Sequence, residues 1–180
     1  MNTVKYLAFS GLMMTLFSAC GPTLTPFTQN LYEENRWTDS ELKKIQFYLS
    51  NDIVLHRELS GGKSDIISGE IKMVSGKQIE EVIIKRGTPG VFLFSPKSNR
   101  FAVSFEENDS NFLIFGPSPK ARSRYVLLAS DWDKNKGIVT YGSKKWRVDS
   151  ESAWSGLLVD LKRMNQVSRK TKVAEGRKVN

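Results

Sequence analysis

The sequence predicts a mainly β protein: an antiparallel sandwich or small barrel with an N-terminal helix and, as one of two alternatives, a C-terminal helix. The main reason is that about nine short segments between Ile53 and Val148 alternate apolar and polar side chains, with turn residues between them. The composition agrees, because 39% of the 180 residues are hydrophobic and 26% are charged, as in an ordinary globular protein. One domain is expected at this length, and no internal repeat is visible.

The N-terminal helix is expected over residues 39–50. Thr38 and Glu41 have the spacing of a capping box, which satisfies backbone N–H groups at the start of a helix. Leu42, Ile45 and Leu49 then recur at the spacing that places side chains on one face of a helix.

The period changes to two residues after this helix, which predicts strands. Ser75-Gly76-Lys77 is expected to be the turn of a hairpin that joins two of them, and Asn108-Asp109-Ser110 separates two others. The predicted strands lie near residues 53–59, 70–73, 79–86, 91–95, 101–105, 112–115, 124–129, 138–141 and 145–148.

Residues 151–167 fit two patterns. Trp154, Leu157, Leu161 and Met164 lie on one face if the segment is a helix, whereas Leu157, Val159 and Leu161 alternate as in a strand. The helical pattern explains more residues, so a helix is the preferred interpretation and a strand is the alternative.

The first twenty residues have the pattern of an export signal. Lys5 gives a positive start, and the apolar stretch 7–17 is too short to span a bilayer. The segment Leu16-Phe17-Ser18-Ala19-Cys20 resembles the lipobox of bacterial lipoproteins. The resemblance implies cleavage before Cys20, acylation of Cys20 and anchoring of the protein in a membrane. The alternative is an ordinary secreted protein in which this cysteine, the only one in the sequence, occurs by chance.

The resemblance also implies a location and a domain organisation. An aspartate after the acylated cysteine favours retention in the inner membrane in this family, so Gly21 implies the outer membrane. No acidic cluster follows Cys20, which favours a position that faces the periplasm. The expected segments are a signal peptide (1–19), a lipidated N-terminus and proline-containing tether (20–36), a globular β-rich domain (37–164) and a basic tail (165–180).

Most of the net charge of +8 lies at the C-terminus, because residues 162–180 carry +6. Such a segment is expected to bind anionic lipid headgroups or an acidic surface of a partner protein, and the alternative is a solvated terminus. Nucleic acid is not an expected partner, because the segment lacks aromatic residues for base stacking. The residues expected to make the contacts are Lys162, Arg163, Arg169, Lys170, Lys172, Arg177 and Lys178.

Three motifs resemble chemical sites and depart from them. Gly61-Gly62-Lys63-Ser64 lacks the first glycine of a phosphate-binding loop. Residues 131–137 have alternating Asp and Asn but no final glutamate ligand for calcium, so a hairpin turn is expected there. His56 and Glu58 would share one face of a strand, where acid–base chemistry is conceivable, but no nucleophile motif accompanies them. We therefore predict no catalytic residue, no metal site and no cofactor.

These features favour a non-enzymatic outer-membrane lipoprotein that acts as an accessory or structural subunit of a larger cell-envelope assembly. Its expected partners are the membrane, through Cys20, and a protein of that assembly. The alternative is a periplasmic β-barrel binding module for an apolar ligand such as a lipid. Segments 91–94 and 112–115 are apolar on both faces, so one face could pack in the core while the other lines a cavity or contacts a partner.

Overall fold

Along the strands of this protein, side chains are alternately buried in the core and exposed to solvent. In β12 (Lys144–Asp149), Trp146 and Val148 are buried while Lys145 and Arg147 are exposed. The computed structural model describes residues 23–59, 70–74, 76–133 and 136–167. Within these residues the protein is mainly β with few helices, as predicted.

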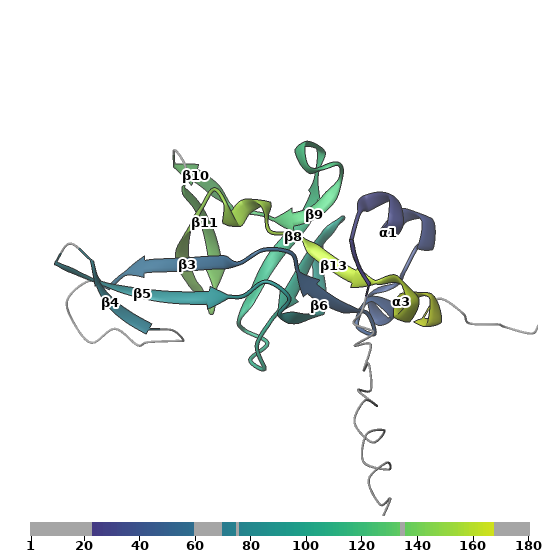
Figure 1. The fold of residues 1–180 in the computed structure, drawn as a ribbon, viewed down its shortest axis with the longest axis horizontal. Helices are drawn as coiled ribbons and strands as arrows, with labels where there is room; N and C mark the ends of the chain where they lie inside the picture. Colours follow the sequence, from purple (N-terminus) through teal and green to yellow (C-terminus); the bar gives the residue numbers. More distant parts are fainter. Residues whose placement is uncertain (1–22, 60–69, 75, 134–135, 168–180) are drawn as a thin grey trace, which may run out of the picture.

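Two antiparallel sheets form a sandwich and not a closed barrel (Figure 1), which decides between the two predicted architectures. The first sheet has seven strands in the order β1-β13-β2-β6-β7-β8-β9, and the second has six in the order β10-β11-β12-β3-β5-β4. The strands of the first sheet are β1 (Leu24–Pro26), β2 (Gln46–Leu49), β6 (Pro89–Lys97), β7 (Arg100–Ser104), β8 (Phe112–Ser118), β9 (Arg124–Leu127) and β13 (Leu157–Asp160). Besides β12, the second sheet contains β3 (Ile53–Glu58), β4 (Glu70–Val74), β5 (Lys77–Ile84), β10 (Asp131–Asp133) and β11 (Lys136–Tyr141).

Aromatic rings fill much of the core. Phe27, Phe101 and Tyr125 are fully buried, and the ring centroid of Tyr125 lies 4.7 Å from that of Phe101 and 5.0 Å from that of Phe27. The second sheet contributes Leu55 and Trp146 to the same continuous core. Rings at these separations pack favourably and occupy the space with side chains.

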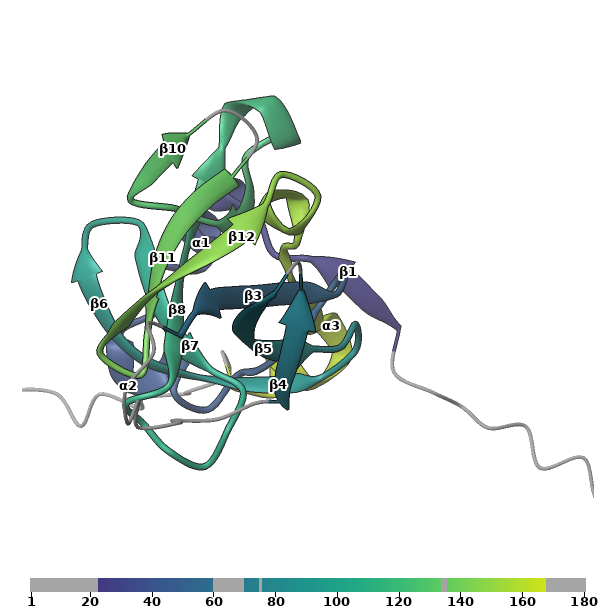
Figure 2. The same cartoon turned by 90° about the vertical axis from the view of Figure 1, so that its left-hand side faces the viewer.

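The two sheets differ at their edges. β9 ends the first sheet, but the Tyr125 N–H donates to Phe27 O (3.0 Å) and the Leu127 N–H donates to Ser155 O (2.9 Å). Gly156 permits this close approach, because a Cβ at that position would lie 2.9 Å from Tyr125 O. At one edge of the second sheet lies β4, in front in Figure 2, and no other strand of the described residues pairs with its outer side.

All nine predicted strands are present, as β3–β9, β11 and β12. Both predicted hairpins also form, because Val74 pairs with Lys77 and Asp133 pairs with Lys136. The alternation of side chains did not reveal β1, β2 and β10, and it indicated β13 only as the alternative to a helix.

The helix predicted over residues 39–50 is wrong for its second half. The helix α2 (Asp39–Leu42) begins at the predicted capping box, where the Thr38 N–H donates to Glu41 Oε2 (2.9 Å). It ends early because β2 follows at once and lies in the middle of the first sheet, between β13 and β6. Phe47 and Leu49 are buried on one face of that strand, so tertiary pairing overrides the helical spacing.

The tether predicted over residues 20–36 is also wrong for the part that the structure describes. Leu24–Pro26 form β1, and the helix α1 (Gln29–Asn35) follows Thr28, whose Oγ accepts a hydrogen bond from the Leu31 N–H (3.2 Å). Phe27 between them is fully buried. Pro26 is tolerated because β1 is an edge strand of three residues. The folded part of the chain therefore begins before residue 37.

Residues 151–167 combine both alternatives. A short 3₁₀ helix, η2 (Ser152–Trp154), precedes β13, and the helix α3 (Leu161–Val167) follows it. The preferred helical interpretation is therefore wrong for 157–160, where Leu157 and Val159 are buried and pair with β2. None of the described helices is long and apolar enough to cross a bilayer. Cys20, the motif at 61–64 and the tail beyond Val167 lie outside the described residues.

Candidate binding groove

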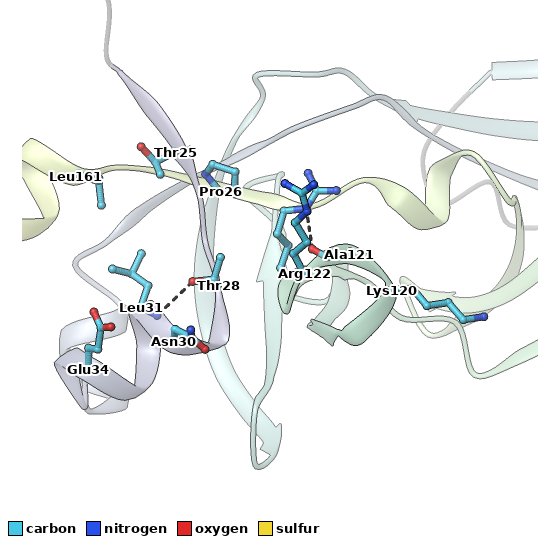
Figure 3. Close-up of a pocket in the computed structure, with 11 residues that line it drawn as sticks. Thr25, Pro26, Thr28, Asn30, Leu31, Glu34, Lys120, Ala121, Arg122 and Leu161 are labelled. Carbon is cyan, nitrogen blue, oxygen red and sulfur yellow. Dashed lines mark hydrogen bonds between the residues drawn. The ribbon is translucent and has the colours of Figure 1, made fainter.

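A groove of about 740 Å³ lies between α1, the start of α3 and a 3₁₀ turn, η1 (Pro119–Ala121), which joins β8 to β9 (Figure 3). Its lining combines apolar side chains with charged ones, so it suits a ligand or surface that is partly apolar and partly charged. The residues that line it are Thr25, Pro26, Thr28, Asn30, Leu31, Glu34, Lys120, Ala121, Arg122, Arg124 and Leu161.

The η1 wall of the groove is held in an unusual backbone conformation. Arg122 and Ser123 are consecutive non-glycine residues in the left-handed region, with φ of 55° and 57°. Such residues cost of order 1 kcal/mol each, and they are common at functional sites. The turn is fixed by the Ser123 N–H, which donates to Ser118 O (2.9 Å), and by the Arg122 N–H, which donates to Pro119 O (3.3 Å). The fold therefore maintains a strained turn that leaves the Arg122 side chain exposed at the rim.

The α1 wall is tied to the η1 wall by a backbone hydrogen bond. The Gln29 N–H at the start of α1 donates to Ser123 O (2.9 Å), and Thr28 and Arg124 form a β-bridge. Leu31 faces the groove from α1 and is partly buried. The α1 and η1 walls are thus joined by main-chain contacts.

The charged side chains of the groove are mainly cationic. Lys120, Arg122 and Arg124 outnumber Glu34, and the Nε of Arg124 donates to Ala121 O (3.1 Å), which fixes that side chain against the wall. This cationic character continues onto α3. We call the surface formed by the groove together with Lys120, Arg122, Arg124, Lys162 and Arg163 the cationic end.

Lys162 and Arg163, two of the residues expected to bind headgroups or a partner, are exposed on α3 beside Leu161. Asp160 holds the start of this helix, because its Oδ1 accepts a hydrogen bond from the Lys162 N–H (3.0 Å). Its Oδ2 lies 3.9 Å from the Nε of the exposed Arg163 side chain. The other expected residues, Cys20, Arg169, Lys170, Lys172, Arg177 and Lys178, lie outside the described residues.

Sequence reasoning missed the cations of the η1 wall. The signal was present, because Lys120, Arg122 and Arg124 stand at every second position of the sequence. Their proximity to α3 depends on the pairing of Thr28 with Arg124 and of Leu24 with Asp160. No local pattern encodes such contacts between distant parts of the chain.

His56 and Glu58 lie on the same side of β3, as predicted, but Glu58 is engaged with cations. Its carboxylate lies 3.0 Å from Lys77 Nζ and 3.5 Å from an Arg147 nitrogen, and the hydrogen bond from Lys77 lowers the pKa of Glu58. His56 is half-buried, and this burial lowers its pKa. Glu58 therefore serves as the partner of two cations, a role that links β3 to β5 and β12.

Two polar contacts, which the sequence did not reveal, lie beside the buried Trp146 ring of β12. The fully buried Glu80 accepts hydrogen bonds from the guanidinium of Arg57, whose Cζ lies 5.3 Å from the centre of the Trp146 ring. The ring centroid of Tyr141 lies 6.2 Å from that of Trp146, and the Tyr141 hydroxyl donates to Glu106 (2.5 Å). Burial and this hydrogen bond raise the pKa of Tyr141. These groups satisfy one another, as buried polar groups must.

Among the described residues, no group of three or more His, Cys, Asp or Glu side chains is placed to hold a metal ion. In the predicted turn at 131–137, Asp131 and Asp133 lie in the short strand β10. Comparison of the chain with protein-family models, with curated proteins and with solved structures found no match.

Proposed function

We propose that this protein is a lipid-anchored outer-membrane lipoprotein that faces the periplasm and acts as a non-enzymatic accessory or structural subunit of a larger cell-envelope assembly. The export signal and the lipobox-like segment that ends at Cys20 are its sequence basis. The geometry of the cationic end supports it.

The observation that carries the proposal is the position of β1, the first described strand, beside β13 and α3. Leu24 pairs with Asp160, the residue that precedes α3. Three residues lie between Cys20 and Leu24, so the four steps from Cα to Cα span about 14 Å at most. An acylated Cys20 would therefore bring Lys162 and Arg163 near the lipid headgroups. Each cation near an anionic surface contributes about 1 kcal/mol of attraction.

The opposite end of the molecule supports the accessory role. In Figure 1 the β4–β5 hairpin and the helices α1 and α3 lie at opposite ends of the longest axis. A chain anchored at its cationic end presents the hairpin away from the membrane. This arrangement suits a protein that connects a membrane to a partner.

Mass measurement and fractionation of the full-length protein test the anchoring. The membrane-extracted wild type should lack residues 1–19 and carry acyl mass, and Cys20→Ala should be neither processed nor membrane-bound. The double variant Lys162→Glu/Arg163→Glu keeps Cys20 and should bind more weakly to vesicles that contain anionic lipid, with no change for neutral vesicles. A wild type without acyl mass contradicts the anchoring.

The accessory role is tested by chemical cross-linking in intact cells. The wild-type protein should form a cross-linked species of one defined size, and Cys20→Ala should lose that species. A chain that stays monomeric under these conditions contradicts the role in an assembly.

A binding module for an apolar ligand such as a lipid is the second candidate. The groove favours it, because Pro26, Leu31 and Leu161 give its lining an apolar part beside the cations. Binding of a fatty acid to the wild type and to Leu31→Glu tests this candidate. Equal binding, or none by either protein, contradicts it.

A further inference from the structure

The cations on the η1 wall of the groove lack acidic partners in the described part of the chain. None of the ion pairs between described residues involves Lys120, Arg122 or Arg124. The Nε of Arg124 donates to Ala121 O (3.1 Å), and the other N–H donors of its guanidinium have no acceptor among the described residues. Lys120 and Arg122 are exposed. Three cations on one wall can therefore bind a negatively charged group of a ligand.

The segments outside the described residues that precede β1 and follow α3 are poor sources of such a negative charge. Residues 20–22 contain no acidic side chain, and residues 168–180 contain Glu175 against five Lys and Arg. The C-terminal segment therefore has the same sign of charge as the η1 wall, which opposes its binding there. A ligand is a better source of the anion than this chain is.

The two ends of the groove differ in character. Figure 3 shows Leu31 and Leu161 toward one end and Lys120 at the other, with Pro26 between them. Both leucines are partly buried, and Glu34, the acidic residue of the described lining, lies at their end and not beside Lys120. The volume of about 740 Å³ is in the range of small-molecule sites. A groove that is cationic at one end and largely apolar at the other suits an anionic amphiphile.

We propose that the groove binds a lipid whose headgroup is a phosphomonoester, with Lys120, Arg122 and Arg124 on the phosphate. Leu31 and Leu161 contact the first part of its acyl chains. The proposal rests on the proposed function, since an acylated Cys20 would hold this end of the molecule beside the lipids of a membrane.

The number and type of the cations favour a phosphate over a carboxylate. A phosphomonoester has a charge of about −1.5 to −2 at neutral pH and three acceptor oxygens, whereas a carboxylate has one charge and two oxygens. Guanidinium groups bind phosphate through pairs of parallel N–H···O bonds, and two of the three cations are arginines. The wall thus provides more positive charge and more donors than a fatty acid can use.

Calorimetric titration of the full-length protein, solubilised in an uncharged detergent, with dihexanoyl phosphatidic acid tests the proposal. This short-chain lipid should bind the wild type. Inorganic phosphate supplies the headgroup alone and dihexanoylglycerol the chains alone, and each should bind about tenfold more weakly or less. Equal binding of inorganic phosphate would overturn the assignment of a lipid, and equal binding of dihexanoylglycerol would overturn the assignment of a phosphate.

Two arginine variants locate the site. Arg122→Gln removes one guanidinium from the groove and should weaken binding of dihexanoyl phosphatidic acid about tenfold or more. Arg36→Gln is the matched control, because Arg36 is also exposed and also has a positive φ (49°) but does not line this groove. It should bind as the wild type does, and both variants should unfold at the wild-type temperature.

No binding by the wild type, or equal binding by the wild type and Arg122→Gln, would overturn the proposal. Equal weakening by Arg36→Gln would also overturn it, because the lipid would then respond to the net charge and not to the groove. Binding in detergent solution does not depend on acylation of Cys20. The failure of this proposal and the failure of the membrane anchoring are therefore distinguishable.

Discussion

The edge strands β9 and β4 of the two sheets differ in whether their outer backbone groups have hydrogen-bond partners among the described residues. The outer edge of β9 in the first sheet is covered, because its Tyr125 and Leu127 N–H groups donate to Phe27 O and Ser155 O. β4 of the second sheet has apolar residues on both faces and, in the described part of the chain, no partner strand on its outer side. The first arrangement satisfies the outward backbone groups of an edge strand, whereas no described strand pairs with those of Ile71 and Met73. The edge strands of the two sheets are therefore expected to differ in how well their backbone amides are protected from solvent.

The largest expected effect comes from the residue that joins the N-terminal segment to the covered edge. Phe27→Ala removes a fully buried ring that packs against Phe47, Phe101 and Tyr125, and should lower the free energy of unfolding by about 4 kcal/mol. The exposed Phe94 is the matched control, and Phe94→Ala should cost less than about 1 kcal/mol. Urea unfolding measures both, and equal effects would show that residues 23–36 are not part of the core.

The base of the hairpin should be the next most sensitive place. Glu80→Gln removes a fully buried negative charge beside the partly buried guanidinium of Arg57, which should cost about 3 kcal/mol. Glu58→Gln, on the neighbouring strand, changes an exposed glutamate and should leave stability nearly unchanged. Thermal unfolding compares the two. A neutral Glu80→Gln would mean that the buried ion pair does not hold the hairpin.

Gly156→Ala tests the covered edge itself. The added Cβ would lie 2.9 Å from Tyr125 O, so β9 must shift, at a cost of about 2 kcal/mol. Hydrogen exchange at the Leu127 amide should accelerate, because this amide donates to Ser155 O. The control is Gly76→Ala in the hairpin turn, where φ is +75° and nothing lies near the new Cβ. If only the control accelerates exchange at Leu127, the described contact is not what covers the edge.

The smallest effect concerns pH. Burial lowers the pKa of His56, Asp149 and Glu81 raise it, and Lys136 and Arg147 lower it. Because the unfolded chain then binds a proton more readily than the folded one, stability should fall as the pH drops below about 6.5. His56→Gln should flatten this part of the pH profile of unfolding. An unchanged profile would assign the pH dependence to other groups.

The sequence predicted those parts of the fold in which local alternation and burial agree. The nine predicted strands between Ile53 and Val148 follow the two-residue period, and the capping box at Thr38 and Glu41 begins a helix. Prediction from the sequence failed where tertiary contacts override the local spacing of apolar residues. Leu42, Ile45 and Leu49 have helical spacing, yet Leu49 lies in a central strand of the first sheet.

The candidate groove could be predicted only in part. Lys162 and Arg163 were identified from the charge of the C-terminal segment, and the run from Lys120 to Arg124 was visible but not used. The groove itself joins residues as distant as Thr25 and Leu161, which only the pairing of β1 with β13 brings together. The open edge of β4 is likewise a property of strand order, and strand order is not encoded in any local pattern.

Residue-resolved amide hydrogen exchange of the free protein tests the contrast between the two edges most directly. In β4 the backbone groups at positions 70, 72 and 74 point toward β5, while those of Ile71 and Met73 point outward. The amides at 70, 72 and 74 should therefore be protected and those of Ile71 and Met73 should exchange rapidly, while Tyr125 and Leu127 on β9 stay protected. Protection of Ile71 and Met73 equal to that of Tyr125 and Leu127 would contradict the account, because the edge of β4 would then already be covered.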